Sequence, residues 1–595
     1  MKQTFLPPDS CRPPVTSSLL WLILAIFPVA VGCGSGAGDV AFPEGWPFPA
    51  GETPVLAEDG MVVTTDAYAS EVGVEILKAG GNAVDAVVAA SFALAVVNPE
   101  AGNIGGGGFM VVRMADGSTA SLDYRERAPL AASRDMYLDE AGELTDASTV
   151  GHRAVGVPGT VAGLWQAHQR FGSLPWAEVV TPALALAEGF EIRERQARQL
   201  RMAREDLVLF PSTRSTFLPG GEAPEVGEVF RQVELAATLA RIAARGRDGF
   251  YTGRTADLIV AEMERGGGLI THADLEQMEA VWRDPVRVEY RGHTIISMPP
   301  TSSGGATLAA MARILEGYEL GSLGYHSTEH VHLLVEAWKR AYADRNTYLA
   351  DPDFVEIPLE RMISEAYGAQ RRAGISMDRA TPSGEVGPGL GPADAGETTH
   401  LSVVDSQGNA VSVTTTINSF FGSKVTVTGA GFLLNNEMDD FSARPGFPNQ
   451  YGLVQGEANA IEPGKRMLSA MTPTIVEDPD GDLLMVVGTP GGATIITNVF
   501  QQISNVVDFG MGLRTAVNAP RLHHQHLPDR IQYEPGALTP QVLSALESMG
   551  HEVEERQRPD AVYPYIGDVQ AILRQGQGIL AGASDHRRGG AAAGY

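Results

Sequence analysis

The sequence is almost free of cysteine. Cys11 and Cys33 are the only two among 595 residues, and both lie near the N-terminus. Cys11 would leave with the export signal described below, and Cys33 would carry lipid. No thiol then remains for a disulfide, a thiolate nucleophile or a cysteine-ligated metal, so these three kinds of site are excluded.

Positive charge is also scarce. Lys and Arg number 44 against 72 Asp and Glu, which gives a formal net charge of −28. Such a chain repels phosphate backbones, so we expect no nucleic-acid partner. Hydrophobic residues make up 44% of the chain, which is enough for a large core. Length alone would suggest about three or four domains.

The prominent apolar run Leu19–Val31 is too short to cross a membrane, because a helical span takes about 20 residues. It follows the positive charges of Lys2 and Arg12, as the core of an export signal does. The run ends in Val31-Gly32-Cys33-Gly34, which resembles a bacterial lipobox, although Ala30 stands where leucine is commoner.

We therefore expect residues 1–32 to be a lipoprotein-type signal peptide and Cys33 to be the lipidated N-terminus. Residues 33–57 are expected to form a flexible tether, since Gly34–Gly51 is rich in Gly and Pro. The protein would then be exported to the periplasm or cell envelope and held on a membrane by the lipid on Cys33. The alternative is an ordinary signal peptide with an incidental cysteine.

A glycine-rich segment follows two predicted helices. Tyr68–Lys78 has apolar residues at helical spacing, and Asn82 can cap a second helix over Ala83–Val97. Gly102–Gly108 then leads into a strand. A phosphate cradle needs a strand before its glycines and a helix after them, and the order here is reversed. Close packing of the backbone is the better interpretation.

A segment that should be easily cleaved precedes a predicted β-hairpin. Thr381–Gly396 is dominated by Pro and Gly and should be exposed and mobile. Thr398–Ile417 then alternates apolar and polar residues about a turn centred on Gln407, which predicts a hairpin. Residues whose numbers add to 814 should face each other, so Thr398 is expected opposite Thr416, with Asn418 on the same side.

A threonine at a new chain start would carry both a hydroxyl nucleophile and an amine. The α-amine has a pKa near ~8, so it can act as the base for its own hydroxyl. Thr416 could orient the Thr398 hydroxyl by a hydrogen bond. The alternative is that these threonines occur only because threonine favours strands.

The residues Glu397 to Asp405 (ETTHLSVVD) resemble the processing site of the γ-glutamyltransferases, N-terminal-nucleophile enzymes that act on glutathione. The resemblance extends from about Glu58 to Tyr595. Its further landmarks, in chain order, are Gly105–Met110, Asp123–Glu126, Pro158–Gly163, Ser302–Gly305, Asn435–Phe441, Pro490–Gly492, Asn518–Arg521 and Gly582–Asp585.

The resemblance implies an α+β fold, one αββα four-layer sandwich built from both parts of the chain. It also implies autocatalytic cleavage between Glu397 and Thr398 into a large chain, 58–397, and a small catalytic chain, 398–595, that stay together as a heterodimer. Glutathione and γ-glutamyl peptides would be donors, and water, amino acids or dipeptides would be acceptors. No cofactor is implied.

Residue roles follow from the same resemblance. It makes Thr398 the nucleophile, Thr416 its hydroxyl partner, and the N–H groups of Gly491 and Gly492 the oxyanion hole. The implied substrate-binding residues are Arg125 and Ser469 for the α-carboxylate, Asn418, Glu437 and Asp440 for the α-amino group, and Tyr451 as a lid.

Two residues depart from the family pattern. Ala470 follows Ser469 where a second serine is common, so one hydroxyl for the carboxylate is missing, worth roughly 1–2 kcal/mol if uncompensated. His586 stands where proline is usual. The histidines at 523, 524 and 526 match no strong metal template, so we expect no metal site.

Two other functions remain open. An acylase for glutaryl or cephalosporin-type amides would share the scaffold but would need no α-amino pocket, and Ala470 leaves that interpretation open. A non-catalytic surface lipoprotein that binds peptides is the alternative from another class, although an intact Thr398 after a breakable segment argues against it.

Overall fold

The structure is a computed structural model that describes residues 40–388, 399–447, 449–450, 456–556 and 565–595. Cys33, Glu397, Thr398 and Tyr451, which the sequence singled out, lie outside these ranges. Within the described ranges, no helix is both long enough and apolar enough to cross a membrane.

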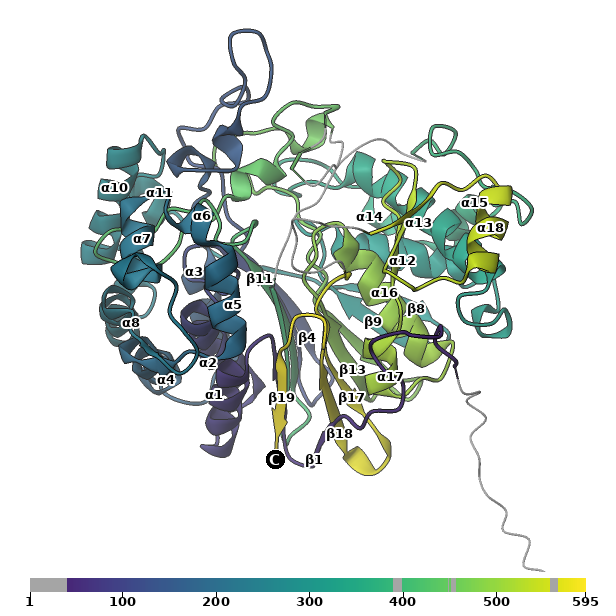
Figure 1. The fold of residues 1–595 in the computed structure, drawn as a ribbon, viewed down its shortest axis with the longest axis horizontal. Helices are drawn as coiled ribbons and strands as arrows, with labels where there is room; N and C mark the ends of the chain where they lie inside the picture. Colours follow the sequence, from purple (N-terminus) through teal and green to yellow (C-terminus); the bar gives the residue numbers. More distant parts are fainter. Residues whose placement is uncertain (1–39, 389–398, 448, 451–455, 557–564) are drawn as a thin grey trace, which may run out of the picture. The chain divides into compact units, whose positions relative to one another are not determined.

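Two seven-stranded antiparallel sheets form the centre of the molecule (Figure 1). The first sheet has the order β1 (Val55–Ala57), β18 (Leu580–Ser584), β17 (Gln570–Arg574), β13 (Leu483–Gly488), β12 (Thr474–Glu477), β9 (His293–Ser297) and β8 (Val286–Tyr290). The second has the order β19 (Ala591–Gly594), β2 (Met61–Thr64), β10 (Thr399–Val404), β11 (Ala410–Thr416), β3 (Gly107–Arg113), β4 (Thr119–Asp123) and β7 (Val281–Arg283).

Helices cover the outer face of each sheet, which makes four layers (Figure 1). The helices on the side of the second sheet are α1 (Ala67–Lys78), α2 (Ala83–Val97), α3 (Thr160–Phe171), α4 (Trp176–Glu188), α5 (Glu194–Met202), α6 (Arg204–Leu207), α7 (Pro211–Phe217), α8 (Val233–Arg245), α9 (Asp248–Tyr251), α10 (Gly253–Gly266) and α11 (His272–Glu276). Those on the side of the first sheet are α12 (Gly304–Leu315), α13 (Thr328–Tyr348), α14 (Leu359–Met362), α15 (Glu365–Arg372), α16 (Thr494–Val507), α17 (Leu513–Asn518) and α18 (Pro540–Ser548).

The expected αββα sandwich is therefore confirmed, and one fold replaces the several domains that length alone suggested. Shorter elements complete it: β5 (Phe190–Glu191) pairs with β6 (Val229–Phe230), and β14 (Leu522–His523), β15 (Ile531–Tyr533) and β16 (Val553–Glu555) form a small sheet. β10 and β11 of the second sheet pack over β13 and β17 of the first. The hairpin singled out in the sequence thus lies at the interface of the two sheets.

The predicted helices differ from the observed ones mainly in their ends. α2 matches the predicted Ala83–Val97, is buried along its whole length, and has the expected cap, since Asn82 accepts from the backbone N–H of Val84. α1 begins at Ala67, one residue before the predicted Tyr68, and α13 runs from Thr328 to Tyr348. Its last turns bury charged residues such as Asp344, which accepts from the Tyr367 hydroxyl, so the apolar periodicity stops before the helix does.

The tether predicted over 33–57 is wrong for residues 40–57. The Trp46 indole donates to the Asn518 carbonyl at 2.8 Å, Phe42 packs on Tyr325, and Val55–Ala57 is strand β1, paired with β18. Glycine and proline shape this segment, but its aromatic residues supply the apolar surface that holds it on the fold.

The exposure predicted over Thr381–Gly396 holds for most of residues 381–388 but not for all of them, and residues 389–398 lie outside the described residues. Ser383 and Val386 are buried, and the backbone N–H of Ser383 donates to Asp529 at 2.6 Å. The N–H of Thr381 donates to Glu336 on α13 at 3.0 Å. These long-range partners carry no local sequence signal.

Candidate active site

The β10–β11 hairpin has the predicted register. Thr399 faces Thr415 and Val404 faces Ala410, and the residue numbers of both pairs add to 814. The expected partner of Thr416 is Thr398, which is outside the described residues. Thr416 ends β11, where its hydroxyl accepts from the backbone N–H of Asn418 at 2.7 Å.

The glycine-rich segment packs directly on this strand end, as expected. A Cβ on Gly106 would overlap the Thr416 carbonyl, and one on Gly108 would lie 2.5 Å from the Thr414 carbonyl. Asn103 ties the two together, because its amide donates to the Thr416 carbonyl at 2.8 Å and accepts from the Gly106 N–H at 3.0 Å. The glycines thus set the position of Thr416 and are not a ligand cradle.

Arg125 lies just after β4 and is completely buried, not on the surface. Its Nη1 is 2.7 Å from Glu437 Oε2, and its Nη2 pairs with Asp440. Its Nε also donates to the Met467 carbonyl at 3.2 Å. Three of the predicted substrate-binding residues therefore form one ion-paired cluster, in which Arg125 is far in sequence from the two acids.

This cluster contains more acid than one guanidinium can balance. Burial raises the pKa of Glu437 to about 8, although Arg125 acts in the opposite direction. Burial likewise raises the pKa of Asp440 well above its ordinary value. A ligand that offers a carboxylate to Arg125 and an ammonium to the two acids would satisfy all three groups. An amino acid that is free, or linked to the rest of the ligand through its side chain, has this chemistry.

Glu126 is a member of this cluster that sequence reasoning missed as a site residue. It is fully buried, its carboxylate lies 3.5 Å from Arg125 Nη1, and neither oxygen has a hydrogen-bond partner among the described residues. Burial raises its pKa to about 8. The signal in the sequence that could have identified Glu126 was its position next to Arg125 at the end of a buried strand.

Asn418 and Ser469, two further predicted binding residues, lie around the same cluster. Asn418 is buried with a positive φ of 69° and donates to the Asn436 carbonyl at 2.9 Å, beside Glu437. The Ser469 hydroxyl accepts from the Met471 N–H at 3.2 Å, and the preceding Leu468 carbonyl accepts from Arg125 at 3.3 Å. Ala470 is completely buried in an apolar cluster.

Gly491 and Gly492 form the turn between β13 and α16. Their φ angles of 139° and 60° favour glycine, and their carbonyls accept from the first turn of α16. Within the described residues, neither N–H donates to a protein acceptor. Two free donors at a helix N-terminus suit a developing oxyanion.

His400 links this turn to the hairpin and was also missed. Its ring packs against Gly488 at the end of β13, and its Nδ1 lies 2.9 Å from the Thr414 hydroxyl. Burial lowers its pKa to about 3, so the imidazole is neutral at physiological pH. The glycine turn is thereby held at the edge where β10 begins.

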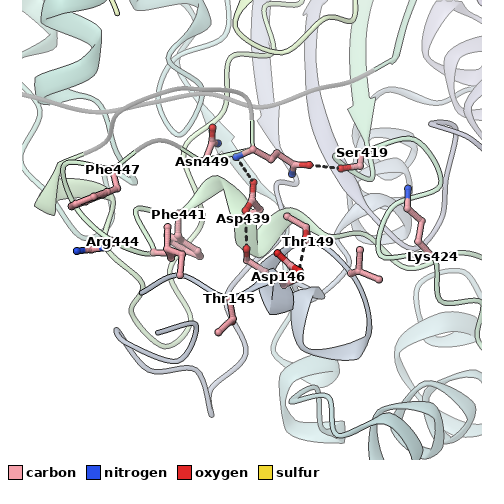
Figure 2. Close-up of a pocket in the computed structure, with 15 residues that line it drawn as sticks. Thr145, Asp146, Thr149, Ser419, Lys424, Asp439, Phe441, Arg444, Phe447 and Asn449 are labelled. Atoms are coloured by element: carbon pink, nitrogen blue, oxygen red, sulfur yellow. Dashed lines mark hydrogen bonds between the residues drawn. The ribbon is translucent and has the colours of Figure 1, made fainter. Parts of the chain in front are cut away.

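A cavity of about 560 Å³ adjoins the cluster (Figure 2). Asp439 is one of its lining residues, and one oxygen of its carboxylate accepts from the Ser148 hydroxyl at 2.8 Å. Asp439 precedes Asp440 and Ser419 follows Asn418, so the cavity shares two walls with the Arg125 cluster. Phe441 and Phe447 provide an apolar side.

One group of side chains has the spacing of metal ligands. The ligand atoms of His332, Glu336 and His551 lie within 4.8 Å of one another. However, Glu336 already pairs with Lys339 at 3.1 Å and Arg340 at 2.6 Å, so its charge is balanced. The predicted weak candidates at 523, 524 and 526 bond to neighbouring side and main chains, as His523 does to Thr497 at 2.8 Å. We propose no metal at either place.

Comparison with known proteins agrees with this geometry. The family model described as gamma-glutamyltranspeptidase matches residues 69–595. A glutathione hydrolase proenzyme of Pseudomonas sp. (strain A14) is 47% identical over 555 residues, covering 92% of this chain and 96% of the relative. An acylase ACY 1 proenzyme of Pseudomonas sp. (strain V22) is 39% identical over 551 residues, covering 91% and 95%.

Solved structures show the same likeness. The cephalosporin acylase of Bacillus halodurans matches with a TM-score of 0.80 at 29% identity, covering 93% of this chain and 99% of that one. The γ-glutamyltranspeptidase of Helicobacter pylori matches with a TM-score of 0.55 at 42% identity, covering 58% of this chain and 98% of that one.

Glu126→Gln should change how stability depends on pH. The folded protein keeps Glu126 protonated up to about pH 8, whereas the unfolded chain ionises it near 4.5. Its stabilising contribution therefore falls as pH rises between these values, by about 1.4 kcal/mol per pH unit. The measurement is urea unfolding at about pH 5.5 and pH 8. As the pH rises between these values, the free energy of unfolding of wild type should fall relative to that of Glu126→Gln.

The matched control is Glu140→Gln, because Glu140 is exposed and should follow the wild type at both pH values. Identical pH dependence in all three proteins would show that Glu126 is ionised in the folded state, contrary to this description of the cluster.

Proposed function

This chain belongs to the γ-glutamyltranspeptidase family, and from that membership we propose that it hydrolyses glutathione and transfers γ-glutamyl groups, with Thr398 as nucleophile. The observation that carries the proposal is the buried cluster of Arg125, Glu437 and Asp440. It suits the α-carboxylate and α-ammonium of a γ-glutamyl group, because few other ligand groups carry both charges so close together.

The donor would enter by exchanging ion pairs. Its α-carboxylate takes the place of Glu437 and Asp440 on the Arg125 guanidinium, assisted by Ser469. The two acids then face the α-ammonium together with Asn418. Burial raises the pKa values of these two acids. The positive charge of the incoming ammonium acts in the opposite direction and favours their ionised forms.

The chemistry would proceed in two half-reactions. The Thr398 hydroxyl attacks the γ-carbonyl carbon and passes its proton to the Thr398 α-amine, while Thr416 orients the hydroxyl. The N–H groups of Gly491 and Gly492 stabilise the oxyanion. The C–N bond breaks, the leaving amine takes the proton, and cysteinylglycine departs when glutathione is the donor. Water or an acceptor amine then attacks the ester and regenerates Thr398.

A free Thr398 amine requires scission between Glu397 and Thr398. We propose that the chain cleaves itself there into a large chain, in which the subunit 58–397 follows residues 33–57, and a small chain, 398–595. The two remain together, and Tyr451 belongs to a lid over the donor. The names of the relatives as proenzymes support the scission. The β10–β11 register supports the pairing of Thr398 with Thr416.

A glutaryl or cephalosporin-type acylase is the second candidate, and the 39% identical acylase relative favours it. A glutaryl group has no ammonium, so it would leave the buried acids Glu437 and Asp440 without a cation beyond Arg125. The γ-glutamyl group is therefore the better fit to this site. A non-catalytic peptide-binding lipoprotein would need neither Thr398 nor scission.

An anilide assay tests the reaction and the donor together. Wild type should release aniline from a γ-glutamyl anilide at least about tenfold faster than from a glutaryl anilide, since one charge-assisted contact is worth about 1.5–3 kcal/mol. Thr398→Ala should release none and remain one polypeptide on a denaturing gel. Faster release from the glutaryl anilide would favour the acylase, and an active uncut wild type would remove Thr398 from the mechanism.

The cavity beside the cluster supports transfer to an amine. The carboxylate of Asp439, which lines the cavity, suits the cationic end of an amino acid or dipeptide acceptor, and Phe441 and Phe447 suit an apolar side chain. Asp439→Asn should raise the KM for a dipeptide acceptor by about tenfold, because a charged contact is lost, and should leave donor hydrolysis unchanged.

The control for that experiment is Asp135→Asn, which changes an exposed carboxylate outside the cavity lining. An unchanged acceptor KM in Asp439→Asn would place the acceptor elsewhere. Product analysis separates hydrolysis from transfer in each variant.

We further propose export through residues 1–32 and attachment to a membrane of the cell envelope by lipid on Cys33. The motif around Cys33 supports this, and Cys33 lies outside the described residues. Cys33→Ser should move the protein from the membrane fraction to the soluble fraction and remove the acyl mass from the large chain. Cys11→Ser is the matched control and should change neither. A soluble wild type without acyl mass would contradict the anchor.

A further inference from the structure

The segment Val40–Glu52, here called the strap, lies across α17 and the turn that follows it. The Trp46 Nε1 donates to the Asn518 carbonyl at 2.8 Å, and the Asn518 amide donates to the Pro49 carbonyl at 2.9 Å. The Gly51 N–H donates to the Thr515 hydroxyl at 3.3 Å. The strap precedes the residues that the family model matches, which begin at 69.

Two aromatic residues of the strap, Trp46 and Phe48, surround one buried cation together with Tyr565. The guanidinium of Arg587 lies 5.7 Å from the Trp46 ring centroid, 4.6 Å from that of Phe48 and 5.9 Å from that of Tyr565. The three rings meet edge-on, with Phe48 and Tyr565 centroids 4.9 Å apart. Such contacts attract the cation and exclude water from it.

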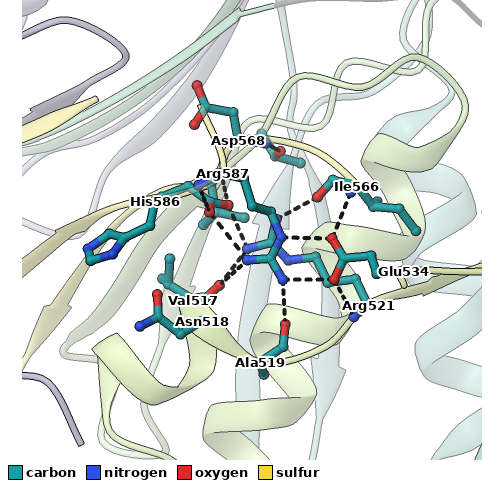
Figure 3. Close-up of polar contacts among 12 residues, drawn as sticks. Val517, Asn518, Ala519, Arg521, Glu534, Ile566, Asp568, His586 and Arg587 are labelled. Carbon is teal, nitrogen blue, oxygen red and sulfur yellow. Dashed lines mark hydrogen bonds and ion pairs between the residues drawn. The ribbon is translucent and has the colours of Figure 1, made fainter. Parts of the chain in front are cut away.

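Arg587 in turn holds, through Glu534, the turn of the chain at Ile566 (Figure 3). Its Nε donates to Glu534 Oε1 at 2.7 Å, and the same oxygen accepts from the Ile566 N–H at 2.7 Å. Arg521 Nη1 donates to the Ile566 carbonyl at 2.6 Å. The Ile566 backbone is therefore fixed on both sides by charged groups.

That turn supports Thr489, which lies two residues before Gly491. The Asp568 N–H donates to the Thr489 hydroxyl at 2.9 Å. Gly567 packs so tightly that a Cβ would lie 2.5 Å from the same hydroxyl. Thr489 leads through Pro490 into Gly491, so a continuous set of contacts joins the strap to the proposed oxyanion hole.

We propose that the strap is a positioning element for the oxyanion hole: Trp46 and Phe48 hold Arg587, and through Glu534 and Ile566 they set the orientation of the Gly491 and Gly492 N–H groups. This inference rests on the proposed function, because it assumes that these groups act on an oxyanion. Since the donors act mainly in the transition state, a misplaced turn should lower kcat more than it raises the donor KM.

The departure at His586 fits the same picture. His586, which is labelled in Figure 3, has its Nε2 3.5 Å from Glu52 at the end of the strap. A proline at position 586 would offer no side-chain nitrogen to Glu52. Glu52 also accepts from the Asn518 amide at 3.4 Å. The residue that departs from the family pattern thus contacts the segment that covers Arg587.

Single variants of the full chain test the proposal by steady-state kinetics with the γ-glutamyl anilide. Trp46→Ala and Phe48→Ala should each lower kcat by about tenfold, within the range that small misplacements of a site produce, and leave KM within about twofold. Trp46→Phe, which keeps a ring but lacks the indole N–H, should recover most of the loss. Rates are expressed per processed chain, counted by intact mass.

The matched control is Phe42→Ala. Phe42 belongs to the same strap but packs near Tyr325 and Met511, away from Arg587. It should lower thermal stability without lowering kcat. If the Phe48→Ala protein does not accumulate, Phe48→Leu takes its place in the kcat test, because leucine keeps apolar bulk and removes the ring.

An unchanged kcat in folded Trp46→Ala and Phe48→Ala, or an equal loss in Phe42→Ala, would overturn the positioning role and leave a strap that only stabilises the fold. Neither result touches the proposed function, which depends on wild-type turnover and its loss in Thr398→Ala.

Discussion

The guanidinium of Arg125 is buried, and a buried cation must have anions within a few ångströms. In this structure the carboxyl groups of Glu437 and Asp440 pair with it and Glu126 lies beside it, while burial raises the pKa of all three acids. The cluster is therefore stable without a ligand yet has spare acidity for a ligand cation. A zwitterion is the guest that this balance of charges fits, which is why the proposed function begins here.

The site is assembled where the ends of the two sheets meet. The polar residues between the sheets, such as His400 and Ser402, are buried and bonded to one another at 3.1 Å, so they position strands without carrying charge. The charged groups around Arg125 and Arg587 are also buried, and each guanidinium pairs with carboxylates. Neutral contacts between the strands and paired charges around these two arginines give a rigid frame for two backbone donors.

Long-range contacts explain where local interpretation went wrong. The strap has the composition of a tether, but Trp46 and Phe48 find a buried cation contributed by residue 587. The segment from Thr381 resembles a loose linker, but Glu336 and Asp529 hold its backbone. In both cases the stabilising partner is distant in sequence, so no window of composition or periodicity contains it.

The sequence by itself determined the helices α1 and α2, the register of the β10–β11 hairpin and, through the family resemblance, the residues of the candidate site. These follow from local periodicity, turn chemistry and motif order. Only the tertiary structure decided that Arg125 is buried among three acids, that the strap covers Arg587, and that His586 meets Glu52. Burial and charge balance depend on which distant segments pack together, and packing is a property of the whole fold.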